Sequence, residues 1–269
     1  MTGQGSELIA FFIQVLAVTV RMGTLWMVFP FFSSQNIPVP VKLAGTLAFS
    51  VALVPIVGPS LPLWLQSSAP AVADMFFFVI KELIIGLGMG LVARFFFLSC
   101  LASAEWVGTQ MGFTVAAMFN PSTQTNESPW GSFHNFLALM VFISIGGHAW
   151  CLQALIESYS LNTDFVLTNF SKNLNIAGFW IEIGKDFFFW MLKLSGPMVA
   201  VVLLLQLGMG VLSKFVPQIN LWTVSIPATL GIGVFVFTLF SPMYGDVLGS
   251  LFGNARESLY LWVKVVGAR

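Results

Sequence analysis

Long stretches without any charged residue are the feature that most limits how this chain can fold. Residues 22–41, 43–73, 194–213 and 215–245 contain no Asp, Glu, Lys or Arg. Each stretch reaches or exceeds the roughly 20 residues that cross the hydrocarbon core of a bilayer as an α-helix. Lipid offers no hydrogen bonds to the backbone, so a segment within it must satisfy its own N–H and C=O groups, as a helix does. These stretches predict an all-α, polytopic integral membrane protein.

The charge balance agrees with this class and excludes others. Charged residues make up only 8% of the chain and hydrophobic residues 57%, with a mean hydropathy of +0.90, whereas about a quarter of a soluble domain is charged. Eleven basic and eleven acidic residues give a formal net charge of zero. Nothing in this balance favours nucleic acid or attraction to anionic lipid. We therefore expect a chain surrounded by membrane lipid and binding no nucleic acid.

Helix-breaking residues and polar clusters mark the boundaries of the predicted helices. The sequence is too continuously apolar for an amphipathic pattern to mark them. The first predicted helix is an uncleaved membrane segment, since the start of the chain has no positively charged region and no small-residue cleavage site follows. The predicted helices cover residues 8–32, 42–66, 72–104, 132–156, 176–213 and 217–241, and an amphipathic tail covers 246–266.

Two segments do not fit a simple stack of spanning helices. A helix over residues 72–104 would reach about 50 Å, against a hydrocarbon core of about 30 Å, so it must tilt, break or leave the bilayer. Seven prolines between residues 30 and 70 should cut the second predicted helix into short pieces. Scattered Lys and Arg residues give no clear orientation by the positive-inside rule. We expect broken helical hairpins that need protein neighbours.

Charged residues inside the predicted helices, or at their ends, are costly unless they face protein or water. In the fifth predicted helix, three of them fall within about 40° of one another and form a polar stripe. Two roles are open: ion pairs that fix the register between helices, which their irregular spacing favours, or the lining of a permeation path. These candidate intramembrane charges are Arg21, Glu82, Arg94, Glu105, Glu182, Lys185, Asp186 and Lys193.

Three glycine pairs with GxxxG spacing provide faces on which helix backbones can approach closely. They are formed by residues 86 and 90, 108 and 112, and 249 and 253. Helix packing of this kind is common in membrane proteins, so the pairs predict contacts and not a particular function.

Patterns typical of catalysis or metal binding are absent from the sequence. Cys100 and Cys151 lack CxxC spacing and are predicted to be two buried thiols. His134 and His148 have no ligand-spaced carboxylate or thiol, and we expect them to form hydrogen bonds at helix ends or between helices. No GxSxG or comparable nucleophile signature occurs. We expect no enzymatic activity, no cofactor and no metal.

Residues 104–132 begin as an apolar, glycine-bearing stretch and end in the Asn, Pro, Ser, Thr and Gln residues of a loop. One interpretation is a short helix packed in a core. The other is a mobile closure, since Met and Phe side chains fill irregular gaps well. The residues alone do not decide between the two.

Five segments together carry a resemblance to a known family. They are PFFSSQNIPVPVKLAGTLAFSVALVP (residues 30–55), KELIIGLGMGLVARFFF (81–97), AEWVGTQMGFTVAAMFNP (104–121), GGHAW (146–150) and VPQINLW (216–222). In this order, and spread over most of the chain, they resemble the FliR family of flagellar type III export-gate proteins and, more distantly, its injectisome counterparts.

The resemblance implies a fold and a set of partners. Residues 1–195 would form a FliP-like helical part, and residues 196–269 a FliQ-like helical hairpin with a C-terminal amphipathic helix. The chain would join FliP and FliQ homologues, with an FlhB homologue nearby, at the flagellar basal body in the bacterial inner membrane. The assembly would pass unfolded flagellar proteins outward as its export substrates.

The resemblance also implies a pore plug, which we call the plug segment and which covers residues 108–121. Its candidate residues are Gly108, Met111, Gly112, Phe113, Met118 and Phe119. The bulky apolar side chains would seal the pore, and the glycines would let the backbone yield. An injectisome export gate remains an alternative, and a self-contained secondary transporter or channel a more distant one, because no internal repeat of the kind found in transporters is evident.

Overall fold

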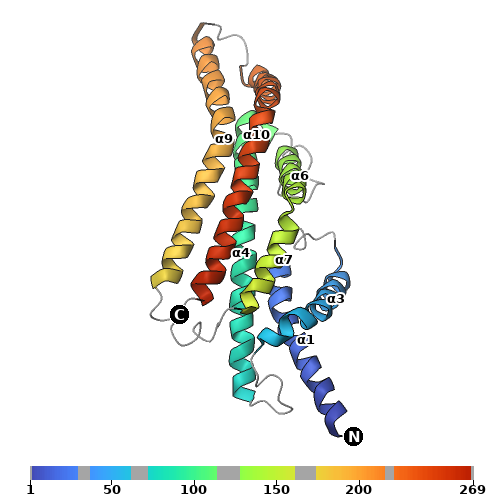
Figure 1. Ribbon diagram of the computed structural model, residues 1–269. Coiled ribbons are helices and arrows are strands. Elements are labelled where there is room, and N and C mark those ends of the chain that lie inside the picture. Colours follow the sequence, from blue (N-terminus) through green and yellow to red (C-terminus); the bar gives the residue numbers. More distant parts are fainter. Residues whose placement is uncertain are drawn as a thin grey trace. The chain divides into compact units, whose positions relative to one another are not determined.

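A computed structural model describes residues 2–29, 37–61, 72–113, 128–160, 174–215 and 221–267. These residues are almost entirely helical, and no β-strand occurs among them (Figure 1). The predicted all-α class is confirmed. The prediction followed because lipid offers no hydrogen-bond partners to backbone groups, and a helix pairs these groups within one segment.

The chain divides into two compact units. Unit 1 comprises Met1–Phe95, Gly146–Ile183 and Asn254–Arg269, and unit 2 comprises Phe96–Ile145 and Gly184–Gly253. Three long helices contribute residues to both units: α4 (Val72–Met111), α9 (Leu174–Phe215) and α10 (Leu221–Gly267). The division at residue 195 that the family resemblance implies stays a prediction, since it concerns likeness to other proteins and not compactness.

Unit 1 begins with α1 (Thr2–Val28), which packs against α3 (Val39–Val57). The end of α1 comes four residues before the predicted boundary at residue 32. The short 3₁₀ helix η1 (Gly58–Ser60) follows α3, and α7 (Gly147–Ser160) also contacts α3. The ring of Trp26 on α1 meets that of Phe49 on α3 edge to face, with 4.9 Å between ring centroids, which holds the two helices through aromatic contact.

The described prolines of this stretch lie near the ends of α3 and in η1. Pro40 lies in the first turn of α3, where the missing N–H would have no partner in any case. Pro55 lies within the helix near its end, and Pro59 falls in η1. Within the described residues, the second predicted helix is therefore one α-helix that ends at Val57 and is followed by the short helix η1. Residues 62–66 of the predicted helix lie outside the described residues.

Helix α4 runs over 40 residues without interruption, so of the three expected possibilities it does not break. It extends beyond the predicted end at residue 104 and stops at Met111. Gly112, the next residue, has a φ of +90°, a left-handed conformation that glycine adopts without the strain other residues would incur. The end of α4 is therefore set by one glycine of the predicted plug segment.

The fourth predicted helix is two helices. α6 (Pro129–Ser144) begins where the Ser128 side chain accepts a hydrogen bond from the Gly131 N–H, and α7 begins at Gly147. Between them Gly146 has a φ of +74°. The sequence interpretation missed this break, because the glycine pair lies within an apolar stretch that otherwise reads as continuous.

The last two predicted elements are one helix. α10 continues through both Pro227 and Pro242 and through the polar cluster near residue 246 that was expected to separate the amphipathic tail. Membrane helices tolerate proline where neighbouring groups satisfy the freed carbonyl. The fifth predicted helix, over residues 176–213, is confirmed as α9.

Five helices among the described residues are long and apolar enough to span a membrane, and α6 with α7 gives a sixth candidate as a bent pair. Many large apolar side chains on these helices are exposed, as on α9 at Leu204, Leu207 and Phe215. Contiguous exposed apolar surface of this extent is found in proteins surrounded by lipid or by partner subunits. The structure thus agrees with a multi-pass membrane protein.

Candidate functional site

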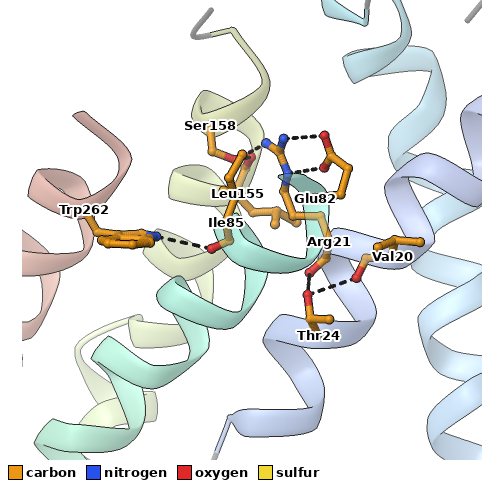
Figure 2. Close-up of polar contacts among 8 residues, drawn as sticks. All are labelled: Val20, Arg21, Thr24, Glu82, Ile85, Leu155, Ser158 and Trp262. Carbon is orange, nitrogen blue, oxygen red and sulfur yellow. Dashed lines mark hydrogen bonds and ion pairs between the residues drawn. The ribbon is translucent and has the colours of Figure 1, made fainter. Parts of the chain in front are cut away.

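A buried ion pair joins two of the predicted intramembrane charges in unit 1. The guanidinium group of Arg21 on α1 donates from Nε to Glu82 Oε2 and from Nη2 to Glu82 Oε1, the latter at 2.8 Å (Figure 2). Both side chains are only 1% exposed. Two parallel bonds between a guanidinium and a carboxylate fix the orientation of both groups as well as their distance.

Helix α7 completes the surroundings of Arg21. The Arg21 Nη1 donates to Ser158 Oγ at 2.7 Å, and the Ser158 hydroxyl in turn donates to the Leu155 carbonyl at 2.6 Å (Figure 2). The ring of Tyr159 lies 3.7 Å from the Arg21 Cζ atom, within the range of a cation–π contact. One buried cation therefore connects α1, α4 and α7. The predicted role of these charges in fixing helix register fits this arrangement.

The glycines of α4 allow α1 to approach next to the ion pair. A Cβ atom at Gly86 would lie 2.2 Å from Thr24 Oγ1 and 2.4 Å from the Arg21 carbonyl oxygen. One at Gly90 would lie 3.0 Å from the Leu25 carbonyl oxygen. The Thr24 hydroxyl is within hydrogen-bond distance of two carbonyls of its own helix (Figure 2). The first GxxxG pair is confirmed as a helix-packing face.

A third glycine of α4 accommodates a tryptophan from α10. The Trp262 Nε1 donates to the Ile85 carbonyl at 3.2 Å (Figure 2). A Cβ atom at Gly88 would lie 2.2 Å from the Trp262 ring. The sequence interpretation took GLGMG only as a packing stretch and did not identify Trp262, Ser158 or Tyr159. No local signal marks these three, because each acquires its partner from a distant part of the chain.

The other predicted charges have separate environments. Arg94 is exposed, and the Glu105 carboxylate accepts a hydrogen bond from the Ser128 N–H at 2.8 Å. The Lys193 ammonium lies over the Trp190 ring, 4.6 Å from its centroid. Glu182 and Lys185 are exposed and Asp186 is half-buried, each with further interactions of its own. Of the predicted charges, the structure therefore pairs Arg21 with Glu82.

Unit 2 holds the beginning of the plug segment. Met111 is fully buried, in a hydrophobic cluster with residues of α6, α9 and α10 such as Trp130, Val202 and Val236. Phe113 stacks on the Trp130 ring at 5.6 Å between centroids. Gly108 faces Trp130 and Ser128, and Gly112 faces Ile226. Residues 108–113 are thus packed against the rest of unit 2.

The remaining plug residues, Met118 and Phe119, lie outside the described residues. The two interpretations of residues 104–132 therefore apply to different parts of this stretch. The described part, up to Phe113, takes the form of a packed helix end, and the mobile closure remains a prediction for the part that follows.

Cys100, Cys151 and His134 are buried. Cys100 and Cys151 are both free and buried, as predicted. The His134 Nδ1 lies 3.0 Å from the Trp130 carbonyl of its own helix. Across the ranges that the structure describes, no group of three or more His, Cys, Asp or Glu side chains could hold a metal ion.

Comparison with known proteins gives a consistent result. Residues 12–255 match the family described as bacterial export proteins, family 1. The chain is 25% identical over 228 residues to the flagellar biosynthetic protein FliR of Escherichia coli strain K12, covering 84% of this chain and 83% of that protein. It is 27% identical over 245 residues to FliR of Pectobacterium carotovorum, covering 89% and 88%. FliR of Bacillus subtilis strain 168 is 23% identical over 263 residues, covering 97% and 99%.

Proposed function

Because this chain belongs to the family of bacterial export proteins, family 1, we propose that it helps to form and to close the pore of the flagellar type III export gate. The chain is a multi-pass subunit of this export apparatus in the bacterial inner membrane, given its similarity to FliR proteins over most of its length and its apolar helices. The resemblance to the FliR family predicted from five sequence segments is confirmed.

The observation that carries the proposal is the end of α4. Met111 and Phe113 anchor the start of the plug segment in the core of unit 2, and Gly112 ends the helix between them. A closure needs such a fixed root, so that the subunit stays assembled while a substrate passes the pore. Met118 and Phe119 then supply bulky, adaptable apolar side chains to seal the pore against ions and small solutes.

The proposed partners are FliP, FliQ and FlhB homologues, with residues 1–195 in a FliP-like part and residues 196–269 in a FliQ-like hairpin. The support from this chain is its uncovered apolar surface. Exposed residues on α9 and α10, such as Leu207, Phe215, Phe235 and Leu239, need lipid or protein around them. Continuous helices of 42 and 47 residues are also longer than a bilayer requires.

The role is structural. We propose that the assembled pore passes unfolded flagellar proteins without any catalytic step by this chain. Three of the predicted charges make contacts between helices: Arg21 pairs with Glu82, and Glu105 supports the start of α6 through Ser128.

A leak assay tests the plug. Met118→Ala combined with Phe119→Ala should let a small membrane-impermeant dye enter cells, while the complex with FliP and FliQ homologues is purified in normal yield. The matched control is Phe136→Ala with Met140→Ala, the same residue types exposed on α6, which should leave dye entry unchanged. Loss of the complex with a tight membrane would overturn the plug, because a purely packed segment gives that result.

Co-expression tests the proposed partners. Produced without FliP and FliQ homologues, the chain should be unstable, because its exposed apolar faces would lack their cover. Produced with them, it should purify in a fixed ratio. A monodisperse and thermally robust monomer would contradict the assembly.

A further inference from the structure

The carbonyl groups at the end of α4 have hydrogen-bond partners that come from other helices. An α-helix leaves its last four carbonyls without intrahelical partners, and buried ones must find others. Among the described residues, the Gly112 N–H donates a local bond to the Thr109 carbonyl at 3.1 Å. The carbonyls of Gln110 and Met111 also meet side chains of α9 and α10.

Gln206 on α9 makes the stronger of these contacts. Its Nε2 donates to the Gln110 carbonyl oxygen at 3.0 Å and lies 3.4 Å from the Gln110 side-chain oxygen. A backbone carbonyl can only accept a hydrogen bond, so the NH₂ end of the Gln206 amide must face α4. The contact therefore joins α9 to the backbone of α4 and depends little on the Gln110 side chain.

Thr229 on α10 makes a second, weaker contact. Its buried hydroxyl lies 3.1 Å from the Met111 carbonyl oxygen, but also 2.9 Å and 3.1 Å from the Ser225 and Ile226 carbonyl oxygens of its own helix. A hydroxyl has one proton to donate, so these three acceptors share it. Thr229 can thus release Met111 without losing its own hydrogen bond.

We propose that Gln206, assisted by Thr229, forms a polar clasp on the last carbonyls of α4 that positions the root of the plug segment. The proposal rests on the pore-closing function proposed above. Gln206 and Thr229 are positioning residues in this scheme, since they act through the end of α4. Neither is among the plug residues or charges that the sequence predicted.

A cavity beside the clasp makes it reversible. Its volume is about 430 Å³, and its polar lining consists of Thr109, Gln110, Gln206, Ser213, Ser225 and Thr229. None of the described residues that line it is charged. A cavity of this size and polarity can take several water molecules, which would bond the Gln110 and Met111 carbonyls once the clasp opens. Exchange of a neutral hydrogen bond for one to water changes the free energy little, so the clasp can open and close.

Substitutions at Gln206 test the clasp. Gln206→Leu replaces the donor with an apolar side chain of similar size. Dye entry per assembled complex should rise by about 2- to 10-fold, because one typical hydrogen bond changes an equilibrium constant by that factor. Gln206→Asn, one methylene shorter, should give a smaller rise. Gln206→Lys restores a donor, and its charge is favourable at a helix C-terminus, so dye entry should return to the unsubstituted level or below.

Two controls have defined results. Gln153→Leu removes a glutamine that bonds within its own helix, to Glu157 at 3.3 Å, and should not change dye entry. Gln110→Leu keeps the carbonyl that accepts the 3.0 Å bond, and should have less effect than Gln206→Leu. A result in which Gln206→Leu and Gln206→Asn both behave like Gln153→Leu would overturn the clasp.

The plug variant separates failure of the clasp from failure of the pore function. If the Met118 and Phe119 double variant leaks and the Gln206 variants do not, the plug stands and the clasp falls. If neither leaks while the complex forms, the proposed function falls and the clasp with it. The double variant Gln110→Cys with Gln206→Cys should be cross-linked by a short bifunctional reagent in the assembled complex. Failure to cross-link would also overturn the clasp, whatever the plug does.

Discussion

The surroundings of Arg21 and the end of α4 are both polar contacts between apolar helices, but they differ in charge and in access. Arg21 and Glu82 form a charged, bidentate pair that is 1% exposed on each side and closely flanked by Gly86. The Gln206 contact is neutral, its side chain is exposed, and a cavity of about 430 Å³ lies beside it.

The difference in charge and access indicates which of the two contacts can open at low cost. Separation of the charged pair would leave an ion in an apolar interior, at a cost of several kcal/mol per ion. Separation of a neutral amide from a carbonyl costs only about 0.5–1.5 kcal/mol if water replaces it. We infer that the Arg21–Glu82 pair holds the helices of unit 1 in one arrangement. The Gln206 contact can open and close, which suits the end of α4 if the plug segment changes its conformation.

Loss of one charged partner should have the largest effect. Glu82→Gln leaves the Arg21 guanidinium without its counter-ion and should destabilise the subunit by about 3–5 kcal/mol. The yield and thermal unfolding of the purified complex would measure this.

The control for this variant removes both charges. Arg21→Met with Glu82→Leu should be much less harmful than Glu82→Gln, because no unpaired charge remains. Equal damage from the single and the double change would show that shape, not charge, matters at this site.

Met111→Ala should have the next largest effect, and it tests whether the end of α4 is anchored by core packing. Although the clasp exchanges easily, Met111 itself is fully buried, so its truncation should destabilise by about 2–5 kcal/mol. Met243→Ala is the matched control, since that side chain is 58% exposed. A thermal melt in which the two variants agree would contradict the packed root.

A methyl group at Gly86 tests the close approach beside the ion pair. Gly86→Ala would place Cβ 2.4 Å from the Arg21 carbonyl oxygen, and such overpacking costs about 1–3 kcal/mol. Gly249→Ala is the control, because its Cβ would meet nothing within 4 Å and alanine favours a helix. Complex yields should fall for the first variant and hold for the second.

The smallest effect is expected at Lys193, which lies over the Trp190 ring. Lys193→Met removes an exposed cation–π contact and should cost only about 0.5–1 kcal/mol. Lys193→Arg keeps a cation above the ring and should match the unsubstituted protein in thermal unfolding. A loss as large as that of Glu82→Gln would mean that Lys193 has a buried ionic role in the assembly.

The candidate sites were partly predictable from the residues. Arg21 and Glu82 stood out because charge is rare in this chain, but their pairing joins positions 61 residues apart and no spacing rule reveals it. The same limit applies to GxxxG: residues 86 and 90 form a contact face, whereas a Cβ atom at Gly249 or Gly253 would meet nothing within 4 Å. The motif supplies small residues, but only the fold brings a second backbone to them.

The all-α membrane class follows from the residues alone, because these apolar segments can satisfy their backbone groups in lipid as helices. Tertiary structure decided where the helices end: α10 continues through Pro242, while the α6–α7 stretch breaks at Gly146. It also decided which polar groups meet, from Arg21 with Glu82 to Gln206 with the end of α4. Intrinsic helix propensity differs by less than about 1 kcal/mol between ordinary residues. An unsatisfied buried polar group costs about 1–3 kcal/mol, and whether it is satisfied depends on partners from distant parts of the chain.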